Sequence, residues 1–478
     1  MAPAPLNLNS TSVMACAIVK ETLIDRPQLQ EKTLNARVLV LGGTGSVGGS
    51  TAVALSKLSP QLHIVFGCRN RILCYGWEKG AAMVDKLGKN SEFAEVNIDN
   101  VDSLETALRD VDLLVHAAGP FQQSENCNVL EAAIETKMAY MDVCDDTSYA
   151  LLAKSLKDRA IAANVPAITT GGIYPGVTNV MAAELVRAAR DESKGEPERL
   201  RFSYYTSGTG GAGPTILATS FLFLGEEVVA YGKGEKVKLK PYSGTINVDF
   251  GKGIGRKNVF LFHLIEKLRI VKLLYFLQQF NSTESFIFRN LQEVRSAHEI
   301  LGVPTVSARF GTAPFFWNLG MVAMTKLLSP ACSYFTQSLN WQIIRFFKWL
   351  VIELYVTRMP IYYGSCRGSI TSGHIISPLD KNFSFGSIFQ EYLRDRNKVQ
   401  QLVQLFDPVV GVFDGIAGER VSMRIDLECS DGRNTVGIFS HRRLSGSVGT
   451  AAAAFALALL EGVTQPGVWF PEEVCTMA

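Results

Sequence analysis

The chain has 478 residues, of which 47% are hydrophobic, so it is long enough for two domains and apolar enough to bury a core in each. Lys and Arg number 47 against 45 Asp and Glu, a balance too even to attract nucleic acid or an anionic membrane by charge, which leaves a small molecule as the expected partner. Nine Cys residues without a Cys-x-x-Cys pair argue for reduced thiols, against a disulfide framework and against a structural zinc site.

Residues 1–36 are expected to form a disordered tail or a weak transit peptide. The first twenty residues contain no Asp or Glu and a single basic residue, Lys20. Transit peptides avoid acidic residues but are usually rich in Arg, so both alternatives stay open.

Residues 37–175 are expected to form an N-terminal Rossmann domain, because apolar runs of strand length alternate there with helical stretches. The predicted strands are 37–41, 62–67, 93–96, 112–116, 140–143 and 165–169. The predicted helices are 50–58, 78–87, 102–109, 125–136 and 149–163. This alternation is typical of a doubly wound parallel sheet, the α/β fold class that binds dinucleotides.

Residues 176–445 are less regular and are expected to form a mixed α/β (α+β) domain for a substrate or a partner. A hairpin is predicted where residues 420–428 and 435–439 flank Asp431 and Gly432. Apolar residues alternate with polar ones along its first strand, which predicts one buried face. The residues of that face are Val421, Met423, Ile425 and Leu427.

Residues 446–478 are expected to form a helix and a tail that pack back on the core. The segment 450–460 is almost purely apolar and Gly462 follows it, as in a buried helix with a glycine stop. The apolar segment 343–356 contains three charged residues and is too short to span a bilayer of about 30 Å. The sequence therefore predicts no transmembrane helix, and peripheral contact of this amphipathic segment with a membrane stays open.

The segment VLVLGGTGSVGGS, residues 38–50, places a glycine-rich turn between a buried strand and a helix. Glycines 43, 45 and 48 satisfy G-x-G-x-x-G, and glycines 42, 45 and 48 satisfy the related G-x-x-G-x-x-G. In either register the first glycine turns the chain, the second admits a pyrophosphate and the third lets helix and strand pack closely. The helix N-terminus adds unpaired N–H groups. The predicted pyrophosphate-binding residues are Gly42, Gly43, Thr44, Gly45, Ser46, Val47 and Gly48.

The dinucleotide is selected after the second strand, where enzymes that use NAD usually carry an acidic residue. This chain has Arg69 and Asn70 there and no carboxylate, so Arg69 can pair with a 2′-phosphate and Asn70 can add a donor. The pattern favours NADP(H) over NAD(H). Asp99 is the candidate adenine contact after the third strand. The loop after the fourth strand is expected to border the cofactor ribose through Ala118, Gly119 and Pro120.

Five segments, GGTGSVGG, GCRN, HAAGPFQ, AYMDVCDD and GGIYPGVTN, together resemble the saccharopine dehydrogenase-like NADP-binding family, and its plant-type members in particular. The resemblance covers residues 37–190 and continues more loosely through 295–318 to PGVWFPEE near residue 470. It implies an NAD(P)-dependent reductase or dehydrogenase that makes or breaks a secondary amine through an imine. The family also contains lipid-droplet-associated homologues. Plant-type members imply a plastid or chloroplast, with the cytoplasm as the alternative.

Three stretches depart from the family's pattern: residues 71–77, 263–289 and 359–389. They are interpreted as loop insertions or as translated intron remnants, and in both cases as surface excursions. The first one matters most, because it lies beside the proposed 2′-phosphate site at Arg69.

The candidate catalytic residues gather around the predicted fifth strand. Tyr140 and Asp142 end that strand and Asp145 follows it, at the carboxyl edge of the sheet where ligands bind. Each of the three could relay a proton or hold an amine. Asp146 is expected to cap the next helix instead.

The candidate substrate-binding residues lie in the second half of the chain. Thr178 and Asn179 follow a Gly-Gly bend in GGIYPGVTN, where a helix start could bind a carboxylate or phosphate, or the segment is only the crossover between domains. Arg309 could clamp a substrate carboxylate bidentately, or form a structural salt bridge. Isolated His residues, such as His116, His298 and His441, predict no metal site.

These patterns favour an NADP(H)-dependent oxidoreductase that transfers a hydride to or from a C=N or C=O bond of a small amino-acid- or amine-derived substrate. The first alternative is a catalytically silent nucleotide-binding regulatory protein, or one associated with a membrane or with lipid. The second is a short-chain-type reductase or epimerase, because GGTGSVGG also fits that group. A homodimer is compatible with each of these readings.

Overall fold

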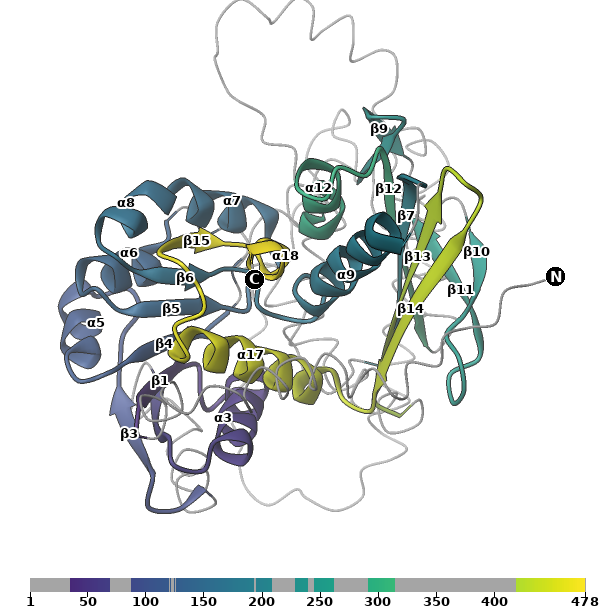
Figure 1. Cartoon of the computed structure of the whole chain (residues 1–478). Coiled ribbons are helices and arrows are strands. Elements are labelled where there is room, and N and C mark those ends of the chain that lie inside the picture. The colour runs from purple at the N-terminus through teal and green to yellow at the C-terminus, as the bar shows by residue number, and fades with distance from the viewer. Residues whose placement is uncertain are drawn as a thin grey trace, which may run out of the picture.

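The computed structural model describes residues 35–68, 87–119, 121, 124, 126–192, 195–208, 228–239, 245–261, 291–313 and 418–477. These residues form two sheets with their helices, and helix α17 (Leu444–Leu460) runs from the second sheet to the first (Figure 1). Several sequence predictions lie outside the described residues. They are the tail up to residue 34, the helix 78–87 except for its last residue, the three proposed insertions and the amphipathic segment 343–356.

The first sheet is parallel throughout, in the order β15-β6-β5-β4-β1-β2-β3. Its strands are β1 (Arg37–Leu41), β2 (His63–Cys68), β3 (Ser91–Glu95), β4 (Leu113–His116), β5 (Ala139–Asp142), β6 (Pro166–Ile168) and β15 (Gly467–Trp469). The first six strands have the Rossmann order 3-2-1-4-5-6, which confirms the predicted doubly wound sheet. The strand β15 comes from 300 positions further along the chain and pairs with β6, as in Gly467 opposite Pro166.

The two faces of this sheet are covered by different sets of helices. Successive side chains of a strand point to opposite faces, so Leu39 packs into one core and Val40 into another. The core of Leu39 includes side chains from α5 (Val101–Leu108), α6 (Asn128–Glu135), α7 (Thr147–Ser155) and α8 (Lys157–Ala162). The core of Val40 includes side chains from α3 (Ser46–Leu58) and α17. Helix α3, which follows the glycine loop, therefore shares one face of the first sheet with α17, a helix that follows the second sheet.

Helix boundaries differ from the sequence prediction where small residues intervene. Helix α3 begins at Ser46 rather than at 50, and α17 begins at Leu444 rather than at 450. Both added segments contain Gly and Ser, which have low helix propensity but allow close packing. The predicted helix 149–163 is two helices, α7 and α8, with Leu156 between them.

The second sheet is mixed, as predicted for this half of the chain. Its main path is β10-β11-β12-β7-β13-β14, and β8 and β9 branch from β12. Its strands are β7 (Pro197–Ser207), β8 (Val228–Gly232), β9 (Glu235–Leu239), β10 (Ile246–Asp249), β11 (Arg256–Leu261), β12 (Thr305–Ala313), β13 (Arg420–Cys429) and β14 (Asn434–His441). Within this path β12 and β7 are parallel, and their neighbours pair antiparallel.

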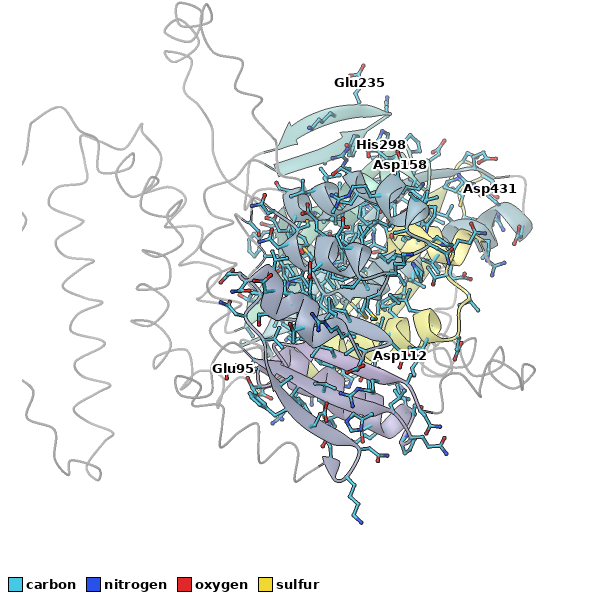
Figure 2. All side chains as sticks on the ribbon, turned by 90° about the vertical axis from the view of Figure 1, so that its left-hand side faces the viewer. Glu95, Asp112, Asp158, Glu235, His298 and Asp431 are labelled. Carbon is cyan, nitrogen blue, oxygen red and sulfur yellow. The ribbon has the colours of Figure 1, made fainter. Side chains whose placement is uncertain are left out.

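One face of the second sheet packs against helices α9 (Val177–Glu192) and α12 (Gln292–Glu299). The predicted hairpin is confirmed as β13 and β14, and Gly432 adopts a φ of +83° in its turn. The four apolar residues predicted for its buried face all belong to the core under α9 and α12. The hairpin of β8 and β9 carries Glu235 near its tip, and Asp431 lies at another turn of the same sheet (Figure 2).

Candidate functional site

The glycine loop joins β1 to α3 at the carboxyl edge of the first sheet. Gly42 has a φ of +73°, and a Cβ at this position would lie 2.6 Å from the carbonyl oxygen of Ala117. A Cβ on Gly48 would lie 2.3 Å from the carbonyl oxygen of Gly42. Gly42 therefore turns the chain and Gly48 lets α3 approach that turn. Of the two glycine registers, the geometry matches the one that begins at Gly42.

The N-terminus of α3 presents donors suited to an anion. Gly45 is the exposed N-cap residue, and a Cβ there would have one close neighbour, the carbonyl oxygen of Gly42 at 3.1 Å. The helix has neither a side-chain cap nor an acidic residue in its first turn. The N–H groups of Ser46, Val47 and Gly48 therefore have no carbonyl partner within the helix. This loop fits a dinucleotide pyrophosphate, since it combines open backbone, N–H donors and the positive end of a helix dipole.

The loop after β4 lies beside the glycine loop. A Cβ on Gly42 would be 2.9 Å from the Cα of Ala118, and Gly119 is exposed one residue later. Ala118 and Gly119, which were predicted to border the cofactor ribose, thus lie near the turn at Gly42. Burial lowers the pKa of His116, at the end of β4, to about 3, so this imidazole is neutral at physiological pH. Its Nδ1 accepts a hydrogen bond from the N–H of Ala118 at 3.4 Å and so supports the loop.

The adenosine side of the predicted cofactor site is described in part. Thr44 donates its hydroxyl to the sulfur of Cys68, the last residue of β2, at 3.7 Å. Asp99 is exposed in the loop between β3 and α5. Arg69 and Asn70, which were predicted to select NADP(H), lie outside the described residues, as does Pro120.

Asp142 is the centre of a buried polar network at the end of β5. Its Oδ1 accepts hydrogen bonds from the N–H of Thr170 (2.9 Å), the N–H of Cys144 (3.0 Å) and the hydroxyl of Thr169 (3.1 Å). Its Oδ2 accepts one from the hydroxyl of Tyr140 at 3.0 Å. Burial raises the pKa of Asp142, and the four hydrogen bonds oppose that rise. The contacts show Asp142 fastening the loops after β5 and β6, and holding Thr170 at a φ of +64°.

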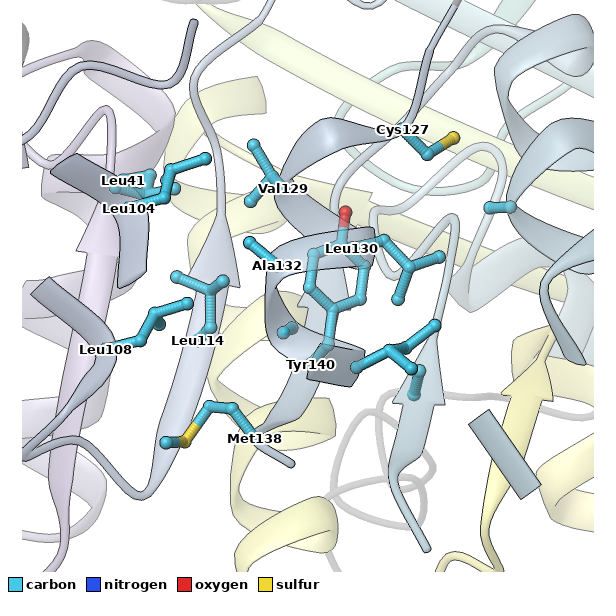
Figure 3. Packing of buried hydrophobic residues seen from close by; sticks show 14 of the residues in the cluster. Leu41, Leu104, Leu108, Leu114, Cys127, Val129, Leu130, Ala132, Met138 and Tyr140 are labelled. Atoms are coloured by element: carbon cyan, nitrogen blue, oxygen red, sulfur yellow. The ribbon is translucent and has the colours of Figure 1, made fainter. Parts of the chain in front are cut away.

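Tyr140 is fully buried beside helix α6, and Figure 3 shows its ring close to Leu130 and Ala132. Its hydroxyl lies 3.4 Å from that of Tyr149. Burial and the neighbouring Asp142 carboxylate raise the pKa of Tyr140 well above its usual value. This phenol therefore holds its proton more tightly than an exposed tyrosine does.

Asp145 and Asp146 have different surroundings. Asp146 is the N-cap of α7 and accepts a hydrogen bond from the N–H of Tyr149 at 2.8 Å, which confirms its predicted capping role. Asp145 is half-buried. Burial raises the pKa of Glu293 in α12 and of Tyr174, and the charge of Asp145 adds to both shifts. Asp145 is thus the candidate catalytic residue that lies near groups of the second sheet and its helices.

Thr178 and Asn179 lie in the first turn of α9 and are buried. Asn179 accepts a hydrogen bond from the N–H of Gly176 at 3.0 Å through Oδ1. It donates one to the hydroxyl of Ser296 in α12, also at 3.0 Å. These contacts tie the segment between β6 and α9 to the second sheet's helices, as the crossover alternative requires.

Arg309 is not brought together with Thr178 and Asn179. Phe310 packs with Tyr174 and Tyr204 on the face of the second sheet that α9 and α12 cover. Because neighbouring residues in a strand point to opposite faces, Arg309 points to the other side. It donates a hydrogen bond there to the hydroxyl of Ser307 at 3.1 Å, and burial lowers its pKa.

Sequence reasoning missed a polar cluster where the carboxyl edge of the first sheet meets the second sheet. Tyr174 stacks on Tyr204 with ring centroids 5.0 Å apart, and its hydroxyl lies 3.2 Å from that of Thr206. The hydroxyl of Tyr204 donates to Oε1 of the fully buried Glu293 at 2.8 Å. No motif marks these residues, because β7 and α12 bring them together from positions about 90 residues apart. The Tyr in GGIYPG was the one available signal.

Neither a metal-binding group of side chains nor a membrane-spanning helix occurs among the residues that the structure describes. Among those residues no three His, Cys, Asp or Glu side chains are grouped so that they could hold a metal ion. In the same part of the chain, no helix has the length and apolar character needed to cross a membrane. His298 stacks on Tyr231 and its Nδ1 lies 2.9 Å from the carbonyl oxygen of Val303, a structural environment.

Comparisons with known proteins follow the same division of the chain. Residues 38–168 match the family model described as the saccharopine dehydrogenase NADP binding domain. Carboxynorspermidine synthase of Vibrio cholerae is 28% identical over 128 residues, which are 24% of this chain and 30% of that protein. The match therefore spans less than a third of the curated relative. Apo saccharopine dehydrogenase (L-Glu forming) of Saccharomyces cerevisiae superposes with a TM-score of 0.53, over 91% of this chain and 94% of that one, at 13% identity. At this identity the superposition shows a shared fold across both sheets.

Proposed function

We propose that the protein is an NADP(H)-dependent oxidoreductase, because residues 38–168 match the family model of the saccharopine dehydrogenase NADP binding domain. It transfers a hydride to or from a C=N or C=O bond of a small amino-acid- or amine-derived substrate. The named relatives support this class of substrate, since one is a saccharopine dehydrogenase and the other a carboxynorspermidine synthase.

The observation that carries the proposal is the uncapped N-terminus of α3 behind the Gly42 turn. The loop from Gly42 to Gly48 would hold the pyrophosphate, and the neighbouring Ala118 and Gly119 would border the ribose of the nicotinamide half. When bound, the nicotinamide supplies or accepts the hydride, and the protein provides orientation, proton transfer and exclusion of water. Arg69 is proposed to pair with the 2′-phosphate.

We place the substrate at the carboxyl edge of the first sheet, on the side of α9 and β7. Asp145 and Tyr174 follow β5 and β6 there, and Tyr204 and Thr206 face them from β7. Asp145 is the proposed proton-transfer or amine-binding group. Asp142 and Tyr140 act behind it, since their contacts fix the loops after β5 and β6.

The first test is titration of the purified full-length protein with NADPH and with NADH, followed by quenching of protein fluorescence. NADPH is expected to bind in preference to NADH. Arg69→Ala is expected to lower the affinity for NADPH by about tenfold or more and to leave the affinity for NADH unchanged. Lys57→Ala serves as the matched control, because it removes a cation from the opposite end of α3. Equal affinity for both dinucleotides in wild type would refute the cofactor assignment.

A second candidate is favoured by the burial of Tyr140 and Asp142. If Asp145 transfers no proton, the chain is a nucleotide-binding protein without turnover. A panel of imines formed from amino acids or polyamines with 2-oxo acids or aldehydes, offered with NADPH, distinguishes the two candidates. The enzyme consumes NADPH with at least one pair and loses that activity in Asp145→Asn, whereas the silent protein binds NADPH and consumes none.

A further inference from the structure

Residues 467–477 fasten the two parts of the molecule together, and we call them the C-terminal clasp. They consist of β15 and the helix α18 (Pro471–Met477). Strand β15 extends the first sheet beside β6, and its Trp469 accepts a hydrogen bond from the N–H of Thr169 at 3.0 Å. Helix α18 packs against α9 on the side of the second sheet (Figure 1). The clasp therefore contacts elements of both sheets.

Glu472 is the point where the clasp enters the second part of the molecule. Its side chain is fully buried, and its Oε1 accepts a hydrogen bond from the hydroxyl of Ser296 in α12. Its Oε2 is buried without a hydrogen-bond partner. A buried carboxylate oxygen without a donor is tolerated far better in the protonated acid than in the charged form.

The segment 169–176, between β6 and α9, is held at both ends by contacts that lead to the clasp. At its first residue, the N–H of Thr169 bonds to Trp469. At its last residue, the N–H of Gly176 bonds to Asn179, whose amide donates to Ser296, which in turn donates to Glu472. This segment contains Tyr174, which we place beside the substrate. A chain of hydrogen bonds thus joins Glu472 to Gly176, at the end of the segment that carries Tyr174.

We propose that Glu472 is a positioning residue, which in its neutral form seats the clasp and holds the segment 169–176 in place, and which on ionisation loosens that segment. The bearing of this switch on turnover rests on the proposed function, but the motion of the segment does not.

The surroundings of Glu472 support a switch near neutral pH. Burial raises its pKa to about 7, and the neighbouring Glu473 adds to the shift, while the hydrogen bond from Ser296 and the nearby amide of Asn179 oppose it. Two cations lie on this side: Lys154 of α7 pairs with Glu473 at 2.6 Å, and the Nζ of Lys157 of α8 lies 4.1 Å from the centre of the Trp469 ring. In α12 the acids on either side of Ser296 are Glu293 and Glu299, each three residues away, and burial raises the pKa of Glu293 too.

The direction and size of the effect follow from linkage. An exposed glutamate titrates at about 4.3, and Glu472 in the closed clasp has a pKa of about 7, so opening the clasp releases a proton between these two pH values. Opening therefore becomes about tenfold more favourable per pH unit from about pH 5 to 7 and reaches a plateau above 7. Between pH 5 and pH 8 the expected increase in the opening equilibrium is roughly one hundredfold.

The test is amide hydrogen exchange of the full-length protein at pH 5, 6, 7 and 8, corrected for the pH dependence of chemical exchange. In wild type, protection of peptides covering 169–180 is expected to fall by roughly one hundredfold from pH 5 to 8, with no comparable fall in peptides of β1 and β2. Glu472→Gln keeps the shape and the acceptor of the neutral acid, and its protection is expected to be independent of pH. Glu473→Gln is the comparison variant: because the charge of Glu473 is one cause of the raised pKa of Glu472, its removal should move the fall in protection to lower pH without abolishing it.

Two results would overturn the proposal. One is equal protection of residues 169–180 at pH 5 and 8 in wild type, which needs no variant and so holds even if Glu472→Gln does not fold. The other is a fall in protection that is the same in wild type and Glu472→Gln, which would assign the pH dependence to another group. Since no dinucleotide is added, neither result depends on whether the protein binds NADPH.

Discussion

Gly449 of α17 offers the sharpest test of how the cofactor helix is held. A Cβ at Gly449 would lie 2.5 Å from the carbonyl carbon of Ser50 and 2.7 Å from the backbone nitrogen of Thr51, both in α3. These are backbone atoms, so no side chain can turn aside to make room. Substitution by Ala must push α17 and α3 apart.

The magnitude can be worked out against a second glycine of the same helix. Replacing Gly by Ala inside a helix stabilises it by about 1 kcal/mol, and overpacking a core costs about 1 to 3 kcal/mol. At Gly446 the nearest atoms to an added Cβ are 3.5 Å and 3.6 Å away, in ordinary contact. Gly446→Ala should therefore raise the free energy of unfolding by up to about 1 kcal/mol. In Gly449→Ala the same gain is set against overpacking, so the free energy of unfolding should fall by up to about 2 kcal/mol.

Urea unfolding followed by circular dichroism measures this difference of about 1 to 3 kcal/mol between the two variants. Titration with NADPH then reports on the glycine loop, because α3 carries that loop at its N-terminus. We expect weaker binding in Gly449→Ala and unchanged binding in Gly446→Ala. The packing argument is refuted if Gly449→Ala is as stable as Gly446→Ala.

Three further variants address the cofactor loop and the buried acids. Gly45→Val adds a side chain at an exposed N-cap, so NADPH titration should show affinity reduced by about tenfold or more, while the melting temperature falls by only a few degrees. Asp142→Asn replaces one acceptor oxygen by an amide donor, although four donors surround this side chain. Its free energy of unfolding in urea should be about 2 to 4 kcal/mol lower than that of wild type. Stability equal to wild type would contradict the network. Glu293 has a pKa raised by burial, so wild type loses stability as the pH rises through that pKa. Glu293→Gln keeps an acceptor for the hydroxyl of Tyr204. Urea unfolding should show this variant to be more stable than wild type by about 1 kcal/mol or more at pH 8, with a smaller difference at pH 5. The opposite trend would exclude a buried neutral acid.

The first sheet could be predicted from the sequence because its strands are buried on both faces. Such strands are continuous apolar runs, so β1 was predicted to the residue, and the glycine loop followed from its place between β1 and a helix. The seventh strand could not be predicted. Strand β15 has three residues, and its pairing with β6 depends on a contact across 300 positions, which no local pattern encodes.

The candidate site was predictable on its cofactor side and not on its substrate side. The glycine loop is one continuous segment whose spacing reflects a single turn and one helix N-terminus. By contrast, Tyr174, Tyr204 and Glu293 come from three separate elements. Arg309 was assigned to the substrate from its residue type, but the face of a strand residue depends on which side the helices cover. Asp142 was chosen for its place at a strand end, where its hydrogen bonds show it holding two loops.

The arrangement of the first sheet also determines the order in which this protein can be completed during synthesis. Part of one face of that sheet is covered by α17, and its edge at β6 is paired by β15, so both wait for residues 444–469 to leave the ribosome. A nascent chain of residues 37–175 has every strand of the Rossmann order but keeps an apolar surface and an open strand edge exposed to solvent. We expect such a fragment to bind the dye ANS and to aggregate, and to be rescued by adding residues 418–477 in trans. In this molecule the first sheet is translated before residues 444–469 but can finish folding only after them.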